Sequence, residues 1–196
     1  GEHLESEYAM KHCYMRIILL ALVAVAVVLS NSTAHADDRE RISTEARMGY
    51  TRIDAHVGGF TPAVAVSYLW PISSKAHFGL GAGGEAFGFG GSTRWIGGFG
   101  GPMTTIQGQP WNKPILIGLT IASDFGRAAK CTPWANPICP RFVGWYPAAR
   151  VFATLVADSG VSVGISYTVR AVWTEIGNDF AHVFAVKGTF DLSRKR

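Results

Sequence analysis

The sequence predicts an all-β protein, an antiparallel up-and-down transmembrane β-barrel of about eight strands. Three observations predict this fold. Apolar residues alternate with small or polar residues with a period of two, and no convincing amphipathic helix follows position 37. The chain also combines 23 glycines with only 16% charged residues. Strands whose second face carries Gly, Ser and Thr rather than dense charge are typical of a narrow membrane barrel.

The N-terminal segment is predicted to be an upstream remnant followed by a cleaved signal peptide. Lys11 and Arg16 precede an apolar run at 17–29 of about thirteen residues, which is the length of a signal-peptide core and short for a spanning helix. Ala34 and Ala36 are the small residues that a signal peptidase reads, so we expect cleavage after Ala36. An uncleaved anchor is the alternative. The predicted parts are residues 1–36, a barrel at 37–192 and a basic tail at 193–196.

Eight candidate strands follow, each about nine residues or longer, which is enough to cross a bilayer when tilted. Pro102 and Pro147 fall inside the fourth and sixth candidates, where proline indicates a bulge or a strand end. The candidates lie near 43–54, 62–70, 76–89, 94–106, 114–125, 142–156, 160–173 and 180–192.

The two faces of these strands differ in a way that indicates which face meets lipid. In the fifth candidate, Ile115, Ile117 and Leu119 share one face, and Gly118 and Thr120 share the other. A transmembrane barrel places its apolar face outward and its polar face inward, and closure satisfies the backbone hydrogen bonds that a bilayer cannot. We therefore predict that the apolar face meets lipid. The alternative is a soluble exported barrel, similar to a lipocalin, in which the face of Ile115 and Ile117 points inward around a small hydrophobic ligand.

The connections between the candidates alternate in length. The long one, at about 126–141, contains Cys131 and Cys139 among three prolines. Export places both cysteines in an oxidising compartment, so we predict a disulfide that stiffens this loop. A metal site is the alternative, but no histidine or third cysteine lies nearby. Because short periplasmic turns and longer outer loops are the rule in such barrels, we expect 126–141 to be extracellular and to contact a partner.

On this architecture, the chain resembles the small eight-stranded outer-membrane barrels of Gram-negative bacteria, the class that includes the outer membrane protein A transmembrane domain and the opacity proteins. The resemblance covers about 37–192 and implies a location in the outer membrane, with lipid and lipopolysaccharide as surroundings. Proteins of this class often end in an aromatic residue that the assembly machinery reads. Here Phe184, Val186 and Phe190 alternate as expected, but 191–196 extend beyond Phe190.

Charged residues on the predicted inner face form the first candidate site. An unpaired charge there would be costly, so we expect the charges to form ion pairs that fill the barrel. A polar path for small solutes is the alternative, although eight strands leave little room beyond their own side chains. The residues are Glu45, Arg47, Glu85, Arg150, Arg170 and Lys187.

Four further residues are candidates for catalysis at the outer rim: His56, His182, Ser123 and Asp124. Outer-membrane lipid A deacylases and acyltransferases use a histidine with a serine or an acidic residue there, and an activated serine needs the histidine within hydrogen-bond reach. His182 also shares its face with Phe184, which would direct it toward lipid headgroups.

The interpretation of the sequence as a whole is a barrel with a structural, adhesive or surface-display role and no chemistry of its own. No cofactor and no metal ion are expected. The net charge of +4 is mild and the basic residues are scattered, which argues against a nucleic-acid surface. The rival functions are a lipid A-modifying enzyme and the lipocalin-like binding protein.

Overall fold

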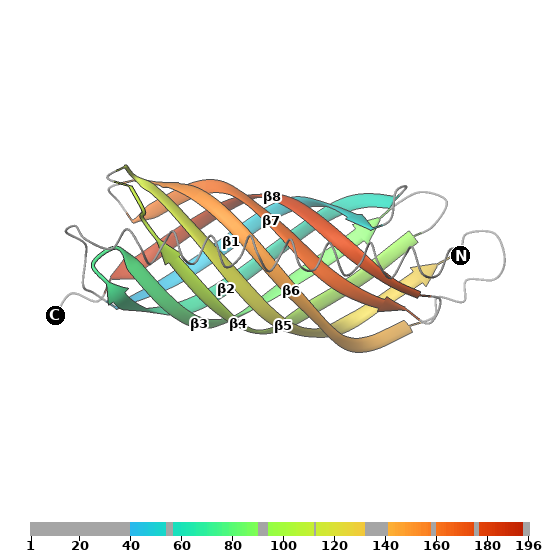
Figure 1. Cartoon of the computed structure of the whole chain (residues 1–196). Coiled ribbons are helices and arrows are strands. Elements are labelled where there is room, and N and C mark those ends of the chain that lie inside the picture. Colours follow the sequence, from blue (N-terminus) through green and yellow to red (C-terminus); the bar gives the residue numbers. More distant parts are fainter. Residues whose placement is uncertain are drawn as a thin grey trace, which may run out of the picture.

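The structure, a computed structural model, describes residues 40–53, 57–89, 94–111, 113–131, 141–157, 160–174 and 177–193. Within these ranges eight antiparallel strands form one closed barrel, in which each strand pairs with its sequence neighbours and the last strand closes on the first (Figure 1). The predicted fold class is therefore confirmed. The strands are β1 (Arg41–Ile53), β2 (Val57–Ser73), β3 (Ala76–Phe89), β4 (Arg94–Gly108), β5 (Ile115–Cys131), β6 (Arg141–Val156), β7 (Val161–Thr174) and β8 (Gly177–Ser193).

The stagger between the strands sets the size of the barrel. We follow the directly paired residues from strand to strand once around the barrel, starting at Trp70 on β2. The path returns to β2 at Phe60, so the strands are staggered by ten residues in one full turn. For eight strands this stagger gives a tilt of about 40° and a radius of about 8 Å, an interior just wide enough for side chains. The path follows the outer face through Trp70, Phe78, Ile106, Leu119, Val151, Tyr167, Phe184, Tyr50 and Phe60.

The outer surface of the barrel is apolar and the interior is polar. Val64 and Ile165 expose 65% and 68% of their surface, whereas Thr120, Arg150 and Lys187 inside the barrel expose 2–4%. This arrangement is the reverse of a water-soluble protein and is typical of a barrel whose outer solvent is hydrocarbon. The chain is thus a transmembrane β-barrel, and the alternative in which Ile115 and its face point inward is wrong. The described residues include no helix that is both long enough and apolar enough to cross a membrane.

We call the end with the β2–β3, β4–β5 and β6–β7 connections the turn end, and the opposite end the loop end. At the loop end β5 is longer than predicted, because it continues to Cys131 in register with β4 and β6. The predicted loop at 126–141 is therefore wrong in its limits. Gly126 and Arg127 keep the alternation of inner and outer positions, and the three prolines that mark the loop come only after Cys131. Residues 132–140 lie outside the described residues.

Neither internal proline ends its own strand, but each coincides with a gap in a neighbouring ladder. Pro102 pairs with Ala82 on β3, while no β4–β5 pair forms at this position. The β6–β7 ladder begins only at Ala148, directly after Pro147, which has no N–H to donate. From Arg141 to Pro147, β6 therefore pairs with β5 alone. We call this segment the open β6 edge.

Close contact between β6 and β7 gives a first prediction. A Cβ added at Gly164 would collide with the carbonyl oxygen of Ala153, whereas no heavy atom lies within 4 Å of a Cβ added at Gly188. We expect Gly164→Ala to lower the free energy of unfolding by about 1–3 kcal/mol because backbone must move. Gly188→Ala, the matched control, should change it little. Urea unfolding from lipid vesicles measures both, and equal effects would contradict this explanation.

Candidate functional site

Among the described residues, seven deeply buried charged side chains form ion pairs with one another inside the barrel; we call this candidate site the lumen charge network. They come from six strands and all are almost completely buried, with side-chain exposures of 3–9%. Six of them are the inner charges expected from the sequence, and the seventh is Asp124. The network comprises Glu45, Arg47, Glu85, Asp124, Arg150, Arg170 and Lys187.

Glu45 is the centre of the first half of the network. Its Oε1 lies 2.6 Å from Nη1 of Arg150 and 2.7 Å from Nε of Arg47, and its Oε2 lies 2.8 Å from Nζ of Lys187. The Lys187 ammonium also lies 3.3 Å from the centre of the Phe152 ring, a cation–π contact. One carboxylate therefore holds three cations from β1, β6 and β8.

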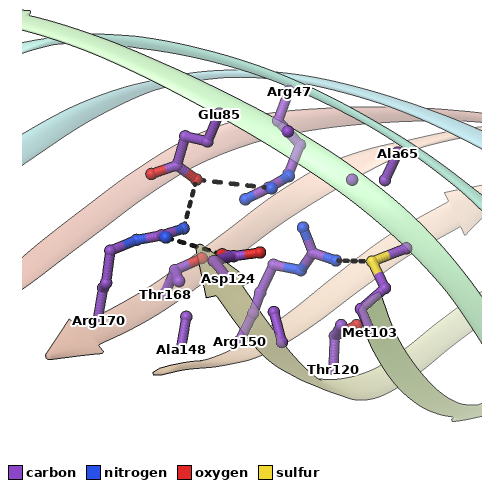
Figure 2. A pocket seen from close by; sticks show the side chains of 13 residues that line it. Arg47, Ala65, Glu85, Met103, Thr120, Asp124, Ala148, Arg150, Thr168 and Arg170 are labelled. Atoms are coloured by element: carbon purple, nitrogen blue, oxygen red, sulfur yellow. Dashed lines mark hydrogen bonds and ion pairs between the residues drawn. The ribbon is translucent and has the colours of Figure 1, made fainter. Parts of the chain in front are cut away.

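The second half of the network lies nearer the loop end. Nη1 of Arg170 lies 2.7 Å from Oδ2 of Asp124, and its Nη2 lies 3.4 Å from Oε2 of Glu85 (Figure 2). Arg47 joins the two halves, because its Nη2 lies 3.6 Å from the same oxygen of Glu85. Glu85 is thus held more loosely than Glu45.

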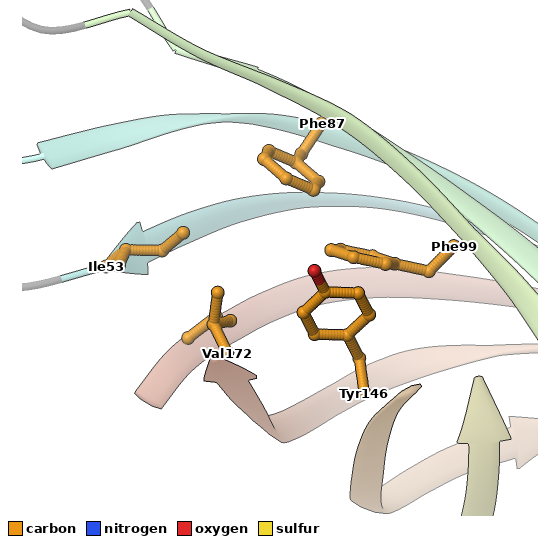
Figure 3. Close-up of a cluster of buried hydrophobic side chains, with 6 residues drawn as sticks. Ile53, Phe87, Phe99, Tyr146 and Val172 are labelled. Carbon is orange, nitrogen blue, oxygen red and sulfur yellow. The ribbon is translucent and has the colours of Figure 1, made fainter. Parts of the chain in front are cut away.

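Apolar side chains close the lumen above the network, at the loop end. We call this group the apolar cap. The ring of Phe99 lies between Phe87 and Tyr146 (Figure 3), with ring centroids 5.0 Å and 4.6 Å away. The Arg170 guanidinium lies 4.4 Å from the centre of the Phe99 ring. The cap separates the charges from the loop end and lowers the local dielectric, which strengthens every ion pair below it. It consists of Ile53, Phe87, Phe99, Tyr146, Val172 and Ala181.

The turn end of the lumen is open and polar by contrast. A cavity of about 220 Å³ lies there, lined by hydroxyl, amide and imidazole side chains such as Ser43, His77 and Gln107. The lining of this cavity contains none of the seven network residues.

The described candidates for catalysis do not form a catalytic arrangement. Ser123 faces outward, where its Oγ accepts a hydrogen bond of 2.7 Å from Nε1 of Trp145. Asp124, the next residue, faces inward to Arg170, so the barrel wall separates it from Ser123. His182 lies on the outer face of β8, with Nδ1 2.7 Å from the hydroxyl of Tyr167. His56 lies outside the described residues.

The predicted disulfide stays a prediction, because Cys131 ends β5 and Cys139 lies outside the described residues. Among the described residues no group of three His, Cys, Asp or Glu side chains could hold a metal ion. Sequence reasoning placed Asp124 on the inner face but assigned it to a rim site rather than to the network. Asp124 lies an even number of positions from Gly118 and Thr120 and therefore shares their inner face, which indicates that it belongs to the network.

Comparison with solved structures agrees with this geometry. Neisserial surface protein A has a TM-score of 0.56 to this chain at 10% identity, over 77% of this chain and 96% of that one. This chain has the fold of the small outer-membrane barrels. Ail, the attachment invasion locus protein of Yersinia pestis, matches at 10% identity over 79% of this chain and all of its own, with a TM-score of 0.49. The outer membrane enzyme PagL matches at 16% identity over 76% of this chain and 98% of its own, with a TM-score of 0.45.

The predicted resemblance to small eight-stranded outer-membrane barrels is confirmed by the match to Neisserial surface protein A. At such low identities the likeness concerns the fold alone. No protein-family model matches the chain, and no curated protein sequence matches it. The function must therefore be argued from the residues of this chain.

Proposed function

We propose that this protein is exported with removal of residues 1–36, spans the outer membrane of a Gram-negative bacterium, and has a structural and surface-display role without chemistry of its own. The observation that carries the proposal is the apolar outer face around a lumen filled by ion pairs and closed by the apolar cap. A lumen packed in this way supports a rigid scaffold rather than a wide pore.

The lengths of the strands support display at the loop end. At a tilt of about 40°, each residue adds about 2.5 Å of height, so a 25 Å apolar band needs about ten residues. β5 has 17 residues and β6 has 16, so their hairpin extends beyond the band. The open β6 edge lies on this extension and has no β7 ladder beside it, which favours contact with an extended segment of a partner.

Basic side chains at the loop end support contact with lipopolysaccharide. Arg52 is exposed on the outer face of β1 and pairs directly with His182, and Arg127 is exposed two positions beyond Phe125 on β5. These cations lie just above the outer aromatic side chains, at the height where lipid phosphates are expected. Guanidinium groups are well suited to phosphate.

The experiment that tests the proposal combines location with topology. We expect the protein to sediment with outer membranes and to migrate differently on a gel when it is not boiled. An epitope inserted within 132–140 should be labelled on intact cells, whereas the same epitope within 158–159, the matched control at the turn end, should not. Labelling of both sites, or of only the second, would contradict the proposed orientation.

Adhesion requires a separate measurement. Cells that display the protein should attach to a surface or partner more than cells without it, and replacing Cys131 and Cys139 by serine should weaken that attachment if the disulfide stiffens the hairpin connection. Unchanged attachment on deletion of the whole gene would reduce the role to a structural one.

A further inference from the structure

The lumen charge network is not electrically neutral. Four of its members are cations, namely Arg47, Arg150, Arg170 and Lys187, and three are carboxylates, namely Glu45, Glu85 and Asp124. The network therefore carries one positive charge in excess. A buried charge without a partner is costly in a low-dielectric interior, so the excess requires compensation.

The geometry places the excess on one side of the network. Glu45 is saturated, because its two oxygens face three cations within 2.8 Å. Glu85, by contrast, reaches Arg47 and Arg170 only at 3.6 and 3.4 Å. Because three cations share the one carboxylate of Glu45, the uncompensated charge lies among them, and Arg47 links it to the loosely held Glu85.

A cavity lies beside two of these cations, Arg47 and Arg150. Its volume is about 30 Å³, above the roughly 10–15 Å³ that one water-sized particle needs. Arg47, Arg150 and Arg170 line it together with the carboxylates of Glu85 and Asp124, so the charged lining has three cations and two anions (Figure 2). Thr120 and Thr168 add hydroxyl groups.

Donors in the wall of the cavity have no protein acceptor. Arg150 and Arg170 are 4% and 3% exposed, yet the Nε of each has no hydrogen-bond partner among the described residues, and neither has the hydroxyl of Thr168. One acceptor in the same wall, Oε2 of Glu85, also has no hydrogen-bond partner, so these donors outnumber it. Buried guanidinium N–H groups and hydroxyls without acceptors favour an anionic ligand, because an anion both accepts the hydrogen bonds and cancels the charge.

We propose that this cavity, bounded by Arg47, Arg150 and Arg170, binds one small monovalent anion of the halide class. The size of the cavity excludes large organic anions. The anion neutralises the network and enters from the turn end, since the apolar cap closes the other end. This site is independent of the surface-display role.

The test uses the purified, folded protein in detergent micelles and compares sodium chloride with sodium gluconate at constant ionic strength. We expect the unfolding midpoint to rise with chloride in a saturable manner by about 2–6 °C, because a ligand that binds only the folded state stabilises it. Crystals soaked in bromide should show an anomalous peak within contact distance of Arg150 and Arg170. A midpoint that does not depend on the anion, or bromide bound only elsewhere, would overturn the proposal.

Met103 supplies a matched pair of variants. Its sulfur lies 3.9 Å from Nη2 of Arg150 and lines the cavity. Met103→Glu places a carboxylate where the anion would bind, so the chloride dependence should disappear. Met103→Gln has nearly the same shape without the charge and should keep the dependence. Chloride dependence of equal size in both variants would indicate a general salt effect and refute the site.

Discussion

Replacing Glu45 by glutamine is expected to lower the free energy of unfolding by about 3–5 kcal/mol. We expect this to be the largest effect of replacing any charged side chain in the barrel by an uncharged one of the same shape. The substitution keeps the volume of the side chain but leaves Arg47, Arg150 and Lys187 without the carboxylate that holds all three within 2.8 Å. The cost arises from the buried cations that remain rather than from the lost attraction alone. Urea unfolding of the protein in lipid vesicles, followed by tryptophan fluorescence, measures the change.

Two controls make this prediction specific. Glu85→Gln removes an equally buried carboxylate whose contacts are longer, at 3.4 and 3.6 Å, and should cost less than half as much. Adding Lys187→Met to Glu45→Gln should restore part of the stability, because it removes one cation that has lost its partner. Equal losses for Glu45→Gln and Glu85→Gln would mean that the network does not centre on Glu45.

The sequence predicts which charged residues belong to the network but does not predict how they pair. Alternation identifies which residues face inward, because the side chains of a strand point to opposite faces in turn. It does not identify their partners. Glu45 on β1 meets Arg150 on β6, 105 positions along the chain, only because the sheet closes with a stagger of ten residues. Closure and stagger are properties of all eight strands together, so no single segment encodes them.

The ends of the strands were the least predictable part of the fold. Turn chemistry marks a loop by proline and glycine, and this rule places the start of the long loop too early, at 126. The true strand continues through Gly126 and Arg127 to Cys131, because cross-strand pairing with β4 and β6 outweighs the weak strand propensity of these residues. The same tertiary pairing keeps Pro102 and Pro147 inside strands.

The catalytic hypothesis illustrates a different limit. Ser123 and Asp124 end the predicted fifth strand, and that place at the outer rim made them candidates. In a strand, adjacent side chains point to opposite faces, so here one meets Trp145 on the outer surface and the other meets Arg170 in the lumen. The β4–β5 ladder is interrupted at both positions, but β5 keeps its pairing with β6 there, and this pairing holds the two side chains on opposite faces.

Replacing Ile165 by arginine is expected to lower the free energy of unfolding from vesicles by about 2–4 kcal/mol, because the charge enters the hydrocarbon core. Ile165 is 68% exposed on the outer face of β7. It lies four residues, or about 10 Å of height, above Val161 at the turn end of the same strand and face. Val161→Arg, the matched control, can extend its guanidinium to the interface and should cost only about 0–1 kcal/mol. In a water-soluble barrel neither site would be desolvated, so both variants would change the free energy of unfolding very little, and that result would contradict the membrane location. A larger loss at Ile165 than at Val161 would identify hydrocarbon as the solvent of the outer face.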